Sequence, residues 1–468
     1  MAHIAVERRS VSMDKWARLV FEQVNEKVIT ASFPIEKWQI RNGQYFAAGY
    51  RWEDDFHPIQ EGDPWGGPDA ACEMTATFTV PEELAGRKVY FHWVTSSEVL
   101  VSENGHYLDG IDPNRSWLPY LDCARAGESH TLRLEAYTRS KPDDDRGINR
   151  KLKGCIQHFT QPALIVIDEE MLALKYDLDM LYQCAYAPNM EDGAKEYYQK
   201  KVEEILPLFP PFESGEEGAL KEALPTIRRF IQEQVYGSDR IFGHSGNLAC
   251  VAHSHLDIAY HWKVEQTIQK NARTALIQLR LMDRWPEFSY AHTQAWTYEQ
   301  LEEHYPEIFE EVRRRIEEGR WEVVGGMYVE PDCNVISAES LIRQILYGKA
   351  YFKEKFGIDA DNAWLPDVFG NSAIMPQILK KCKMPYFVSN KMSTWNDTNR
   401  FPHNHFIWRG LDGSEVYACV PPVHFITWME PAQAIDHWAC FQDRDISPES
   451  LQMFGYGDGG SGATDDMM

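Results

Sequence analysis

The sequence predicts a multidomain protein with a jelly-roll-like β-sandwich over residues 1–170, a helical connector over residues 171–242 and an α/β domain over residues 243–468. Three successive hydrophobic patterns predict this order. Apolar and polar residues alternate in the first part, the pattern becomes helical and charged in the second, and strand-like and helix-like segments follow one another in the third. A chain of 468 residues is long enough for several domains.

Period-two alternation defines the first domain, which follows a short helical start. The turn signal Glu103-Asn104-Gly105 separates two of its expected strands. Its aromatic residues fit either structural packing or carbohydrate binding, and we expect packing, because many sandwich domains bind nothing. The residues that share one face of each expected strand are Cys72, Met74, Ala76, Phe78 and Val80, then Val89, Phe91 and Trp93, and then Leu132, Leu134 and Ala136.

Repetition of helix and strand defines the third domain. One expected helix ends at Gly319, and a strand begins directly after it at Trp321–Val324. The many Glu and Arg residues of this helix predict a solvated face. Repeats of this kind build an α/β sheet or an incomplete barrel, in which functional groups collect at the carboxyl ends of the strands. The inward stripe of the helix is Leu301, Tyr305, Ile308, Phe309, Val312 and Ile316.

The first polar motif is AHSHLDIAYHW at residues 252–262, which follows the apolar run Leu248–Val251. Side chains two residues apart on an extended chain share a face, so His255 and Asp257 point the same way. An imidazole nitrogen and a carboxylate oxygen suit zinc or a similar divalent ion, which needs about two further ligands. The alternative is a His that satisfies buried backbone groups at a strand end.

The second polar motif is WLPDVFGNSAIMPQILKK at residues 364–381. Asp367 follows the apolar segment Ala363–Pro366 and precedes Gly370, which predicts a strand end and a sharp turn. A helix capped by Ser372 is expected to follow. Asp367 then either takes part in chemistry at the rim of the sheet or only caps the turn. The residues expected to face inward from the helix are Ile374, Ile378 and Leu379.

The second half of the chain contains several further segments, which together form one set of motifs. With the two motifs above, they run in order from about residue 245 to the end. The segments are QLRLMDRWPEF at 278–288, EEGRWEVVGGMYVEPDCN at 317–334, ESLIRQILYGKAYF at 339–352, WNDTNRFPHNHFIWRGLDGSEV at 395–416 and GYGDGG at 455–460. The whole set resembles a glycoside hydrolase family 38 α-mannosidase, nearer to the cytosolic and bacterial branch than to the Golgi or lysosomal one. Many motifs at sensible spacings are more specific than any single pattern.

This resemblance implies a retaining glycosidase with a seven-stranded-barrel-like α/β catalytic domain. Carried over by position, it implies that His255, Asp257 and Asp367 bind zinc, with cobalt or another divalent ion as alternatives, and that Asp367 is also the nucleophile. A retaining enzyme needs a second carboxyl group to protonate the leaving oxygen, and Asp458 in GYGDGG is the candidate acid/base. The alternative for Asp458 is a plain surface turn.

The resemblance also implies substrate contacts. Lys391, Trp395 and Asn396 are expected to line the sugar pocket. Tyr260 stands where the related branch usually has a Trp, which puts fine specificity in question more than reaction type. Two further aromatic residues either stack on sugar faces or pack in the core; they are Trp262 and Trp408.

Composition indicates which partners to expect. The formal net charge is −24, which argues against nucleic acid and anionic membrane and favours neutral ligands such as mannose-containing oligosaccharides. The charged N-terminal residues and the lack of a long apolar run predict neither a signal peptide nor a transmembrane helix. Nine scattered cysteines without a CxxC pair predict free thiols in the cytoplasm. The oligomeric state is open, with a homo-oligomer as one alternative.

The chain stops at Met468, whereas the family continues with a helical bundle, which carries a further metal-ligand His, and β-sandwich domains. We therefore expect an incomplete catalytic domain, and His403, His405 and His424 are not convincing substitutes for that ligand. The function predicted from the sequence is that of a retaining, zinc-dependent exo-α-mannosidase acting on oligomannosides. The alternatives are a truncated, non-catalytic mannoside-binding remnant and a metal-dependent carbohydrate deacetylase, in which Asp367 is a base.

Overall fold

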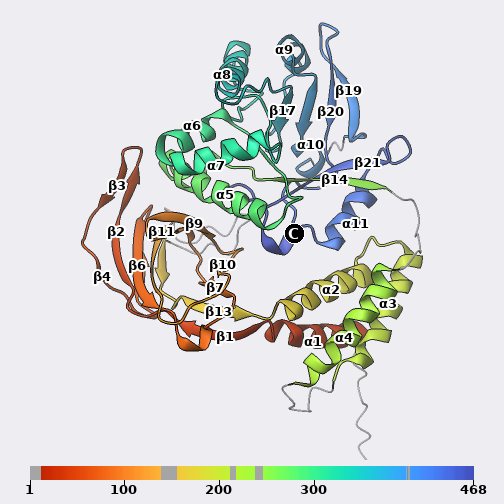
Figure 1. Cartoon of the computed structure of the whole chain (residues 1–468). Helices are drawn as coiled ribbons and strands as arrows, with labels where there is room; N and C mark the ends of the chain where they lie inside the picture. Colours follow the sequence, from red (N-terminus) through yellow and green to blue (C-terminus); the bar gives the residue numbers. More distant parts are fainter. Residues whose placement is uncertain (1–11, 139–154, 211–217, 238–245, 397, 399–400) are drawn as a thin grey trace, which may run out of the picture. The chain divides into compact units, whose positions relative to one another are not determined.

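The computed structural model describes residues 12–138, 155–210, 218–237, 246–396, 398 and 401–468 (Figure 1). These residues form two compact units. The first takes its described residues from Met1–Ala31, Val166–Ser245 and Glu430–Ala439, and the second from Ser32–Ile165, Gly246–Met429 and Cys440–Met468. The domain boundary predicted at residue 242 lies outside the described residues, and the predicted division into three domains stays a prediction.

The first unit is helical, as the pattern over residues 171–242 predicts. Two of its helices, α1 and α2, begin at side-chain caps: Ser12 accepts a hydrogen bond from the backbone N–H of Lys15, and Asp168 accepts one from that of Met171. The core between α1 and α2 contains Val20, Val24, Leu174, Leu178 and Leu181. The elements are α1 (Met13–Glu26), α2 (Glu169–Tyr186), α3 (Asp192–Ile205), η2 (Leu206–Leu208), α4 (Ala219–Ile231), η4 (Gln232–Tyr236) and α11 (Pro431–Cys440).

The second unit contains the predicted antiparallel β-sandwich. Asn104 and Gly105 both have positive φ, 49° and 87°, and join β8 to β9 in a tight hairpin. Of the residues predicted to share inward faces, all except Phe78 are buried. One sheet has the order β1 (Ile29–Pro34), β13 (Ala163–Ile167), β7 (Val89–His92), β10 (Trp117–Leu121). The other has the order β3 (Gly49–Trp52), β2 (Gln39–Phe46), β6 (Ala71–Thr79), β11 (Ser129–Tyr137), β8 (Glu98–Glu103), β9 (His106–Ile111), with β4 (His57–Pro58) paired to β2, and β5 (Pro64–Gly66) pairs separately with β12 (Ile156–His158).

The second unit also contains the predicted α/β domain, whose strands lie in two separate four-stranded sheets. The predicted seven-stranded-barrel-like sheet is therefore not confirmed. The first sheet is parallel and has the order β16 (Trp321–Val323), β15 (Tyr290–His292), β14 (Asn247–His253), β21 (Glu449–Phe454). The second has the order β17 (Asn362–Leu365), β18 (Tyr386–Ser389), β20 (Glu415–Cys419), β19 (His405–Arg409), with only β19 antiparallel.

Two helix predictions in this domain were wrong in detail. The stripe from Leu301 to Ile316 belongs to two helices, because Pro306 lacks an N–H and begins a new helix at its first position. Ser372 is not the cap of the next helix, which begins at Met375 with Ile374 before it. The helices of the domain are α5 (Val264–Arg284), α6 (Ala295–His304), α7 (Pro306–Glu317), α8 (Ala338–Phe356), α9 (Met375–Lys381) and α10 (Lys391–Thr394), and the 3₁₀ turns of the unit are η1 (Glu82–Leu84) and η5 (Asp465–Met467).

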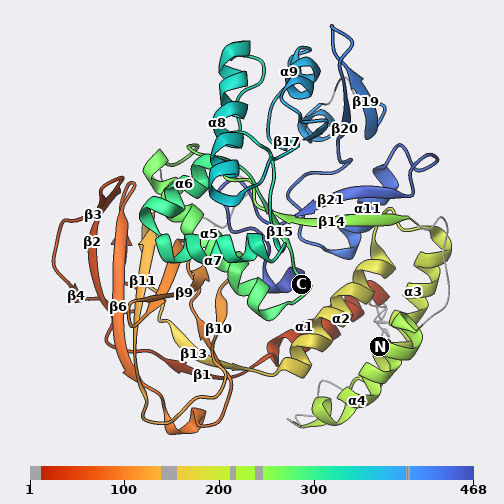
Figure 2. The ribbon, with the colours of Figure 1, turned by 45° about the horizontal axis from the view of Figure 1, so that its top comes forward.

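Helix α5 has an unusual buried surface, which is partly polar. It contacts α6 and α7 of its own domain and the sandwich strands β8 and β9. Figure 2 shows α5 next to α7 and β9. Ordinary core residues such as Ala272 and Leu276 fill part of this surface. Asn271, Thr274 and Gln278 are equally inaccessible, each with 0% exposure. Buried polar groups of this kind require hydrogen-bond partners. Thr274 and Gln278 find theirs in the backbone of Ser461, in the loop that follows β21.

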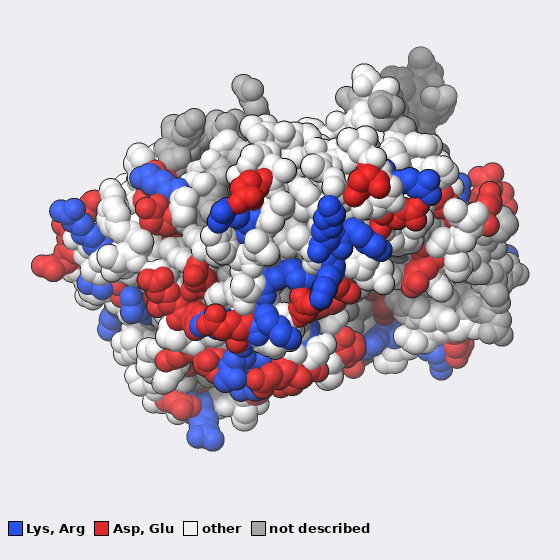
Figure 3. Space-filling model, turned by 90° about the horizontal axis from the view of Figure 1, so that it is seen from above, with Lys and Arg blue, Asp and Glu red and all other residues white. Residues whose placement is uncertain are grey.

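Charged side chains on the surface are mixed in sign. Figure 3 shows Lys and Arg next to Asp and Glu over most of one face. The predicted solvated face of α7 is confirmed, because Arg313 is half exposed and pairs with Glu310 and Glu317 at 2.6 and 3.0 Å. Among the described residues, no helix combines the length and the apolar character needed to cross a membrane.

Candidate active site

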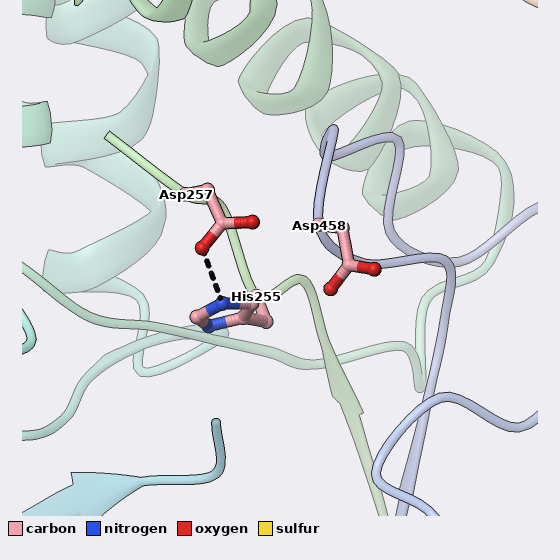
Figure 4. Close-up of side chains that lie close together, drawn as sticks. All are labelled: His255, Asp257 and Asp458. Carbon is pink, nitrogen blue, oxygen red and sulfur yellow. Dashed lines mark hydrogen bonds and ion pairs between the residues drawn. The ribbon is translucent and has the colours of Figure 1, made fainter. Parts of the chain in front are cut away.

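Four predicted residues follow the carboxyl ends of strands in the two α/β sheets and line one cavity. Strands β14 and β21 run side by side, with Ala252 opposite Phe454, so the segments that leave their carboxyl ends meet. These segments carry His255 and Asp257 from β14 and Asp458 from β21, and Figure 4 shows the three side chains close together. Asp367 follows β17 in the second sheet. All four residues line one cavity of about 500 Å³.

His255 lies at the centre of the cluster. Its Nε2 is 3.2 Å from Oδ1 of Asp257 and 3.4 Å from Oδ2 of Asp367. On the other side of the ring, Nδ1 is 3.3 Å from Oε1 of Glu330. Burial lowers the pKa of His255, but the surrounding carboxylates of Glu330, Asp257 and Asp367 raise it well above its ordinary value. The site therefore favours a positive charge at this position.

Glu330 is the functional candidate that sequence reasoning missed. It follows β16, and the hydroxyl of Thr293 donates to its carboxylate at 3.2 Å. Its backbone N–H donates to the side chain of Gln294 at 3.0 Å, which fixes the segment. The other carboxylate oxygen, Oε2, is buried and has no hydrogen-bond partner among the described residues. The only sequence signal was its place shortly after a strand, within a segment that matched the family pattern.

Asp367 and Lys391 form an ion pair inside the cavity. The two residues meet because β17 and β18 are parallel neighbours with Leu365 opposite Ser389, and each strand is followed two residues later by one member of the pair. Burial raises the pKa of Asp367, but its hydrogen bond and charge interaction with His255 and those with Lys391 together lower it below its ordinary value. Asp367 is thus held as a carboxylate.

Asp458 lies in a loop that only glycines can bring so close to β14. A Cβ on Gly455 would lie 2.3 Å from the carbonyl oxygen of His253, and one on Gly457 would lie 3.0 Å from the side chain of Ile426. The backbone N–H of Asp257 donates to the carbonyl of Asp458 at 3.0 Å. Burial and the nearby carboxylates raise the pKa of the Asp458 side chain to about 6, against the opposing effect of His255. Asp458 therefore holds a proton at higher pH than Asp367 does.

The donor set fits a divalent cation. Ligand atoms of His255, Asp257 and Asp458 lie within 4.8 Å of one another. One imidazole nitrogen and several carboxylate oxygens suit zinc and related ions. Asp367, the third predicted ligand, is outside this triplet but contacts His255 directly. The buried Oε2 of Glu330 adds to the uncompensated negative charge at the site.

The other predicted substrate residues divide into two groups. Tyr260, Lys391 and Trp395 line the cavity, whereas Asn396 is not among the described lining residues. Trp262 is buried and donates to Thr267, and Trp408 packs against Phe387, so these rings have structural contacts. The three His residues considered as substitute ligands are also absent from the described lining; they are His403, His405 and His424.

Comparison with known proteins adds two domain matches. Residues 245–468 match the N-terminal domain of the glycosyl hydrolases family 38, and residues 32–148 match the alpha-mannosidase jelly roll domain. The second match covers much of the sandwich described above. The first contains every residue of the cavity.

Individual proteins similar to this chain are named alpha-mannosidase. The chain is 29% identical to Alpha-mannosidase 2C1 of Homo sapiens, over 88% of this chain and 40% of that protein. It is 26% identical to Alpha-mannosidase of Saccharomyces cerevisiae, over 99% of this chain and 43% of that protein. A solved alpha-mannosidase from Enterococcus faecalis aligns with a TM-score of 0.42 and 21% identity, over 46% of this chain and 25% of that chain. The chain thus spans less than half the length of these relatives.

Proposed function

We propose that this chain, whose residues 245–468 belong to the glycosyl hydrolases family 38, carries the active site of a retaining, metal-dependent α-mannosidase. The reaction is the release of terminal α-linked mannose from oligosaccharides. One observation carries the proposal, namely that His255, Asp257, Asp367 and Asp458 line a single cavity in that domain. The relatives named α-mannosidase support the substrate class.

The metal ligands in this proposal are His255, Asp257 and Asp367, with Asp458 beside them. Zinc is the proposed ion, and cobalt or another divalent ion is the alternative. When bound at these residues, such an ion would supply Lewis-acid chemistry toward the hydroxyl groups of the terminal sugar. Glu330 supports the site by accepting a hydrogen bond from Nδ1 of His255, which leaves Nε2 facing the carboxylates.

Asp367 is the proposed nucleophile. Its carboxylate attacks the anomeric carbon while the bond from that carbon to the leaving oxygen breaks, which gives a covalent mannosyl-enzyme. The attack requires the ionised form. Interactions with His255 and Lys391 lower the pKa of Asp367, and an ion bound to neutral His255 would supply the positive charge on that side. The ion pair with Lys391 also restrains the orientation of the carboxylate.

Asp458 is the proposed acid/base. With a pKa raised to about 6, its carboxyl group can give a proton to the leaving oxygen in the first step. In the second step, the resulting carboxylate takes a proton from the water that attacks the anomeric carbon. Mannose then leaves with retained configuration, and the carboxylate of Asp367 is regenerated.

Exposed aromatic residues at the cavity suit a sugar ring. Tyr260, Phe369 and Trp395 line the cavity with 59%, 70% and 62% exposure. Aromatic faces of this kind present apolar surface to the C–H groups of a sugar. Asn396, which follows Trp395 in the chain, remains a proposed substrate contact. We also place the reaction in the cytoplasm, because nine free cysteines suit a reducing compartment.

The experiment that tests this function is hydrolysis of p-nitrophenyl α-mannoside by the chain, with added zinc or cobalt and with a chelator, beside the Asp367→Asn variant. We expect metal-dependent release that is lost in Asp367→Asn, with α-mannose as the first product seen by proton NMR. Folded protein that binds mannose but releases no nitrophenol would instead identify a non-catalytic mannoside-binding remnant.

A further inference from the structure

We propose that the β-sandwich positions the candidate acid/base, because it holds residues 457–463, here called the Asp458 loop, against helix α5. The proposal rests on the proposed function, since it concerns how Asp458 is held for proton transfer. Both the sandwich and α5 belong to the same compact unit. The sandwich would then be a working part of the active site as well as a neighbouring domain.

The Asp458 loop has a backbone that needs external support. Asp458 and Ser461 have φ angles of 60° and 81°, in the left-handed region that residues other than glycine rarely adopt. Gly460 and Gly462 have φ angles of 88° and 70° in the same region. Strained conformations of this kind persist at functional sites only where the surrounding structure fixes them. The contacts that fix this loop therefore bear on where Asp458 points.

Helix α5 supplies the first set of contacts, all to the loop backbone. Thr274 Oγ1 accepts a hydrogen bond from the N–H of Ser461 at 2.9 Å. Gln278 Nε2 donates to the carbonyls of Ser461 and Ala463 at 2.6 and 3.1 Å. Arg273 Nη2 donates to the carbonyl of Gly459, the residue next to Asp458, at 3.1 Å. The polar surface of α5 thus has a purpose, which is to bind this loop.

The sandwich supplies the second set of contacts, from β8 and from the residue that follows β9. Asp112 accepts a hydrogen bond from the hydroxyl of Ser461. Glu98 pairs with Lys270 and with Arg273, whose Nη1 is 3.1 Å from the carboxylate. A Cβ on Gly459 would lie 3.1 Å from Oε1 of Glu98, so this sandwich side chain also touches the loop.

Burial makes these contacts sensitive to substitution. Glu98 is 7% exposed, and Lys270 and Arg273 are each 2% exposed. Without the negative charge of Glu98, Lys270 and Arg273 would lose a buried carboxylate partner, and Arg273 would lose the group that orients it toward Gly459. Glu98 is therefore a positioning residue for Asp458, acting through Arg273, and Asp112 is a second one, acting through Ser461.

The test uses Glu98→Gln and Ser461→Ala in the full chain, with Glu73→Gln as the matched control. Glu73 is also a buried carboxylate of the sandwich, paired with Arg41 and Arg133 at 2.6 and 2.7 Å, but these partners do not belong to α5 or the loop. Hydrogen exchange of peptides covering residues 456–463 and the leaving-group dependence of kcat/KM, which reports the first chemical step, are measured for all three variants. Dinitrophenyl α-mannoside, whose leaving group needs little protonation, is compared with phenyl α-mannoside.

We expect Glu98→Gln and Ser461→Ala to lower kcat/KM for the phenyl substrate by about tenfold or more, to change kcat/KM for the dinitrophenyl substrate much less, and to speed exchange in the loop. Glu73→Gln should change neither the ratio of the two rates nor exchange in the loop. Equal losses on both substrates together with unchanged exchange would overturn the proposal. If the wild-type chain cleaves neither substrate, the proposed function fails, and the exchange result alone decides whether the sandwich holds the loop.

Discussion

Glu330 and His255 form a hydrogen bond of 3.3 Å between Oε1 and Nδ1, on the side of the imidazole that faces away from Asp257 and Asp367. A carboxylate can only accept, so Nδ1 donates to Glu330, and a metal ion among Asp257 and Asp367 would bind Nε2 in place of the hydrogen on that nitrogen. The strand order of the first sheet produces this pairing, because β16 and β14 lie on either side of β15.

Removal of this support should weaken metal binding. We predict that Glu330→Ala lowers the affinity for zinc roughly 10–100-fold, and that Glu330→Gln, which keeps an acceptor, lowers it less. Competition with a chromogenic chelator measures the affinity independently of activity. The exposed carboxylate variant Glu339→Gln on α8 is the control. Equal affinity in the wild type and in Glu330→Ala would show that Glu330 does not tune the site.

Loss of the acid/base should be rescued by a small nucleophile. We predict that Asp458→Ala lowers hydrolysis of phenyl α-mannoside by about 10²–10⁴-fold, because no group remains to protonate the leaving oxygen. On an activated aryl mannoside, azide should restore turnover and give mannosyl azide, since an anion needs no base to attack the mannosyl-enzyme. Metal content is measured alongside, because Asp458 lies near the ligands. Full activity in Asp458→Ala would remove it from this role.

Glycine at position 455 should be essential for steric reasons. In Gly455→Ala the new Cβ would lie 2.3 Å from the carbonyl oxygen of His253, at a φ of 124°. In the control Gly127→Ala the φ is 79°, and no atom lies within 4 Å of the new Cβ. Strain alone predicts a loss of about 1–2 kcal/mol in the free energy of unfolding for the control, and added overpacking predicts more than about 3 kcal/mol for Gly455→Ala. Urea denaturation measures both, and equal losses would contradict the steric account.

Buried histidine should make the fold sensitive to acid. Burial lowers the pKa of His292 from 6.5 to about 3, so the folded chain keeps this ring neutral while the unfolded chain protonates it. The contribution of His292 to stability is therefore fully present above about pH 6.5 and is lost as the pH falls toward 3. From about pH 6.5 to 5.5 the free energy of unfolding should fall by up to about 1.4 kcal/mol from this group.

Urea denaturation across that range tests the acid prediction in the wild type, in His292→Gln and in the exposed control His106→Gln. The pH dependence should be shallower in His292→Gln and unchanged in His106→Gln. An identical pH dependence in all three proteins would show that His292 has no such effect.

The local residue pattern was sufficient for much of the fold and part of the site. Alternation predicted the sandwich faces, and the spacing of His255 and Asp257 after an apolar run predicted two residues of the cavity. The prediction of one long helix was wrong at Pro306. The apolar stripe continues through this residue, but proline has no N–H to continue the backbone hydrogen bonds of the helix.

Features that depend on which strands are neighbours could not be read from the sequence. The Asp367–Lys391 ion pair exists because β17 and β18 are adjacent and in register, and residue spacing does not encode that register. Glu98 contacts the Asp458 loop at Gly459, and these two residues are 459 − 98 = 361 positions apart in the sequence. Family resemblance named Asp367 and Asp458, but only the packing identifies the residues that hold them.

The most direct test of the central claim is covalent trapping of the nucleophile. The metal-loaded chain is incubated with a fluorinated mannosyl fluoride that forms the mannosyl-enzyme faster than water removes it, and the labelled peptide is identified by mass spectrometry. We predict one sugar per chain, on Asp367, and no label in Asp367→Asn. Hydrolysis of aryl mannosides without any label, or with a label on Asp458, would contradict the assignment of Asp367 as the nucleophile of a retaining α-mannosidase.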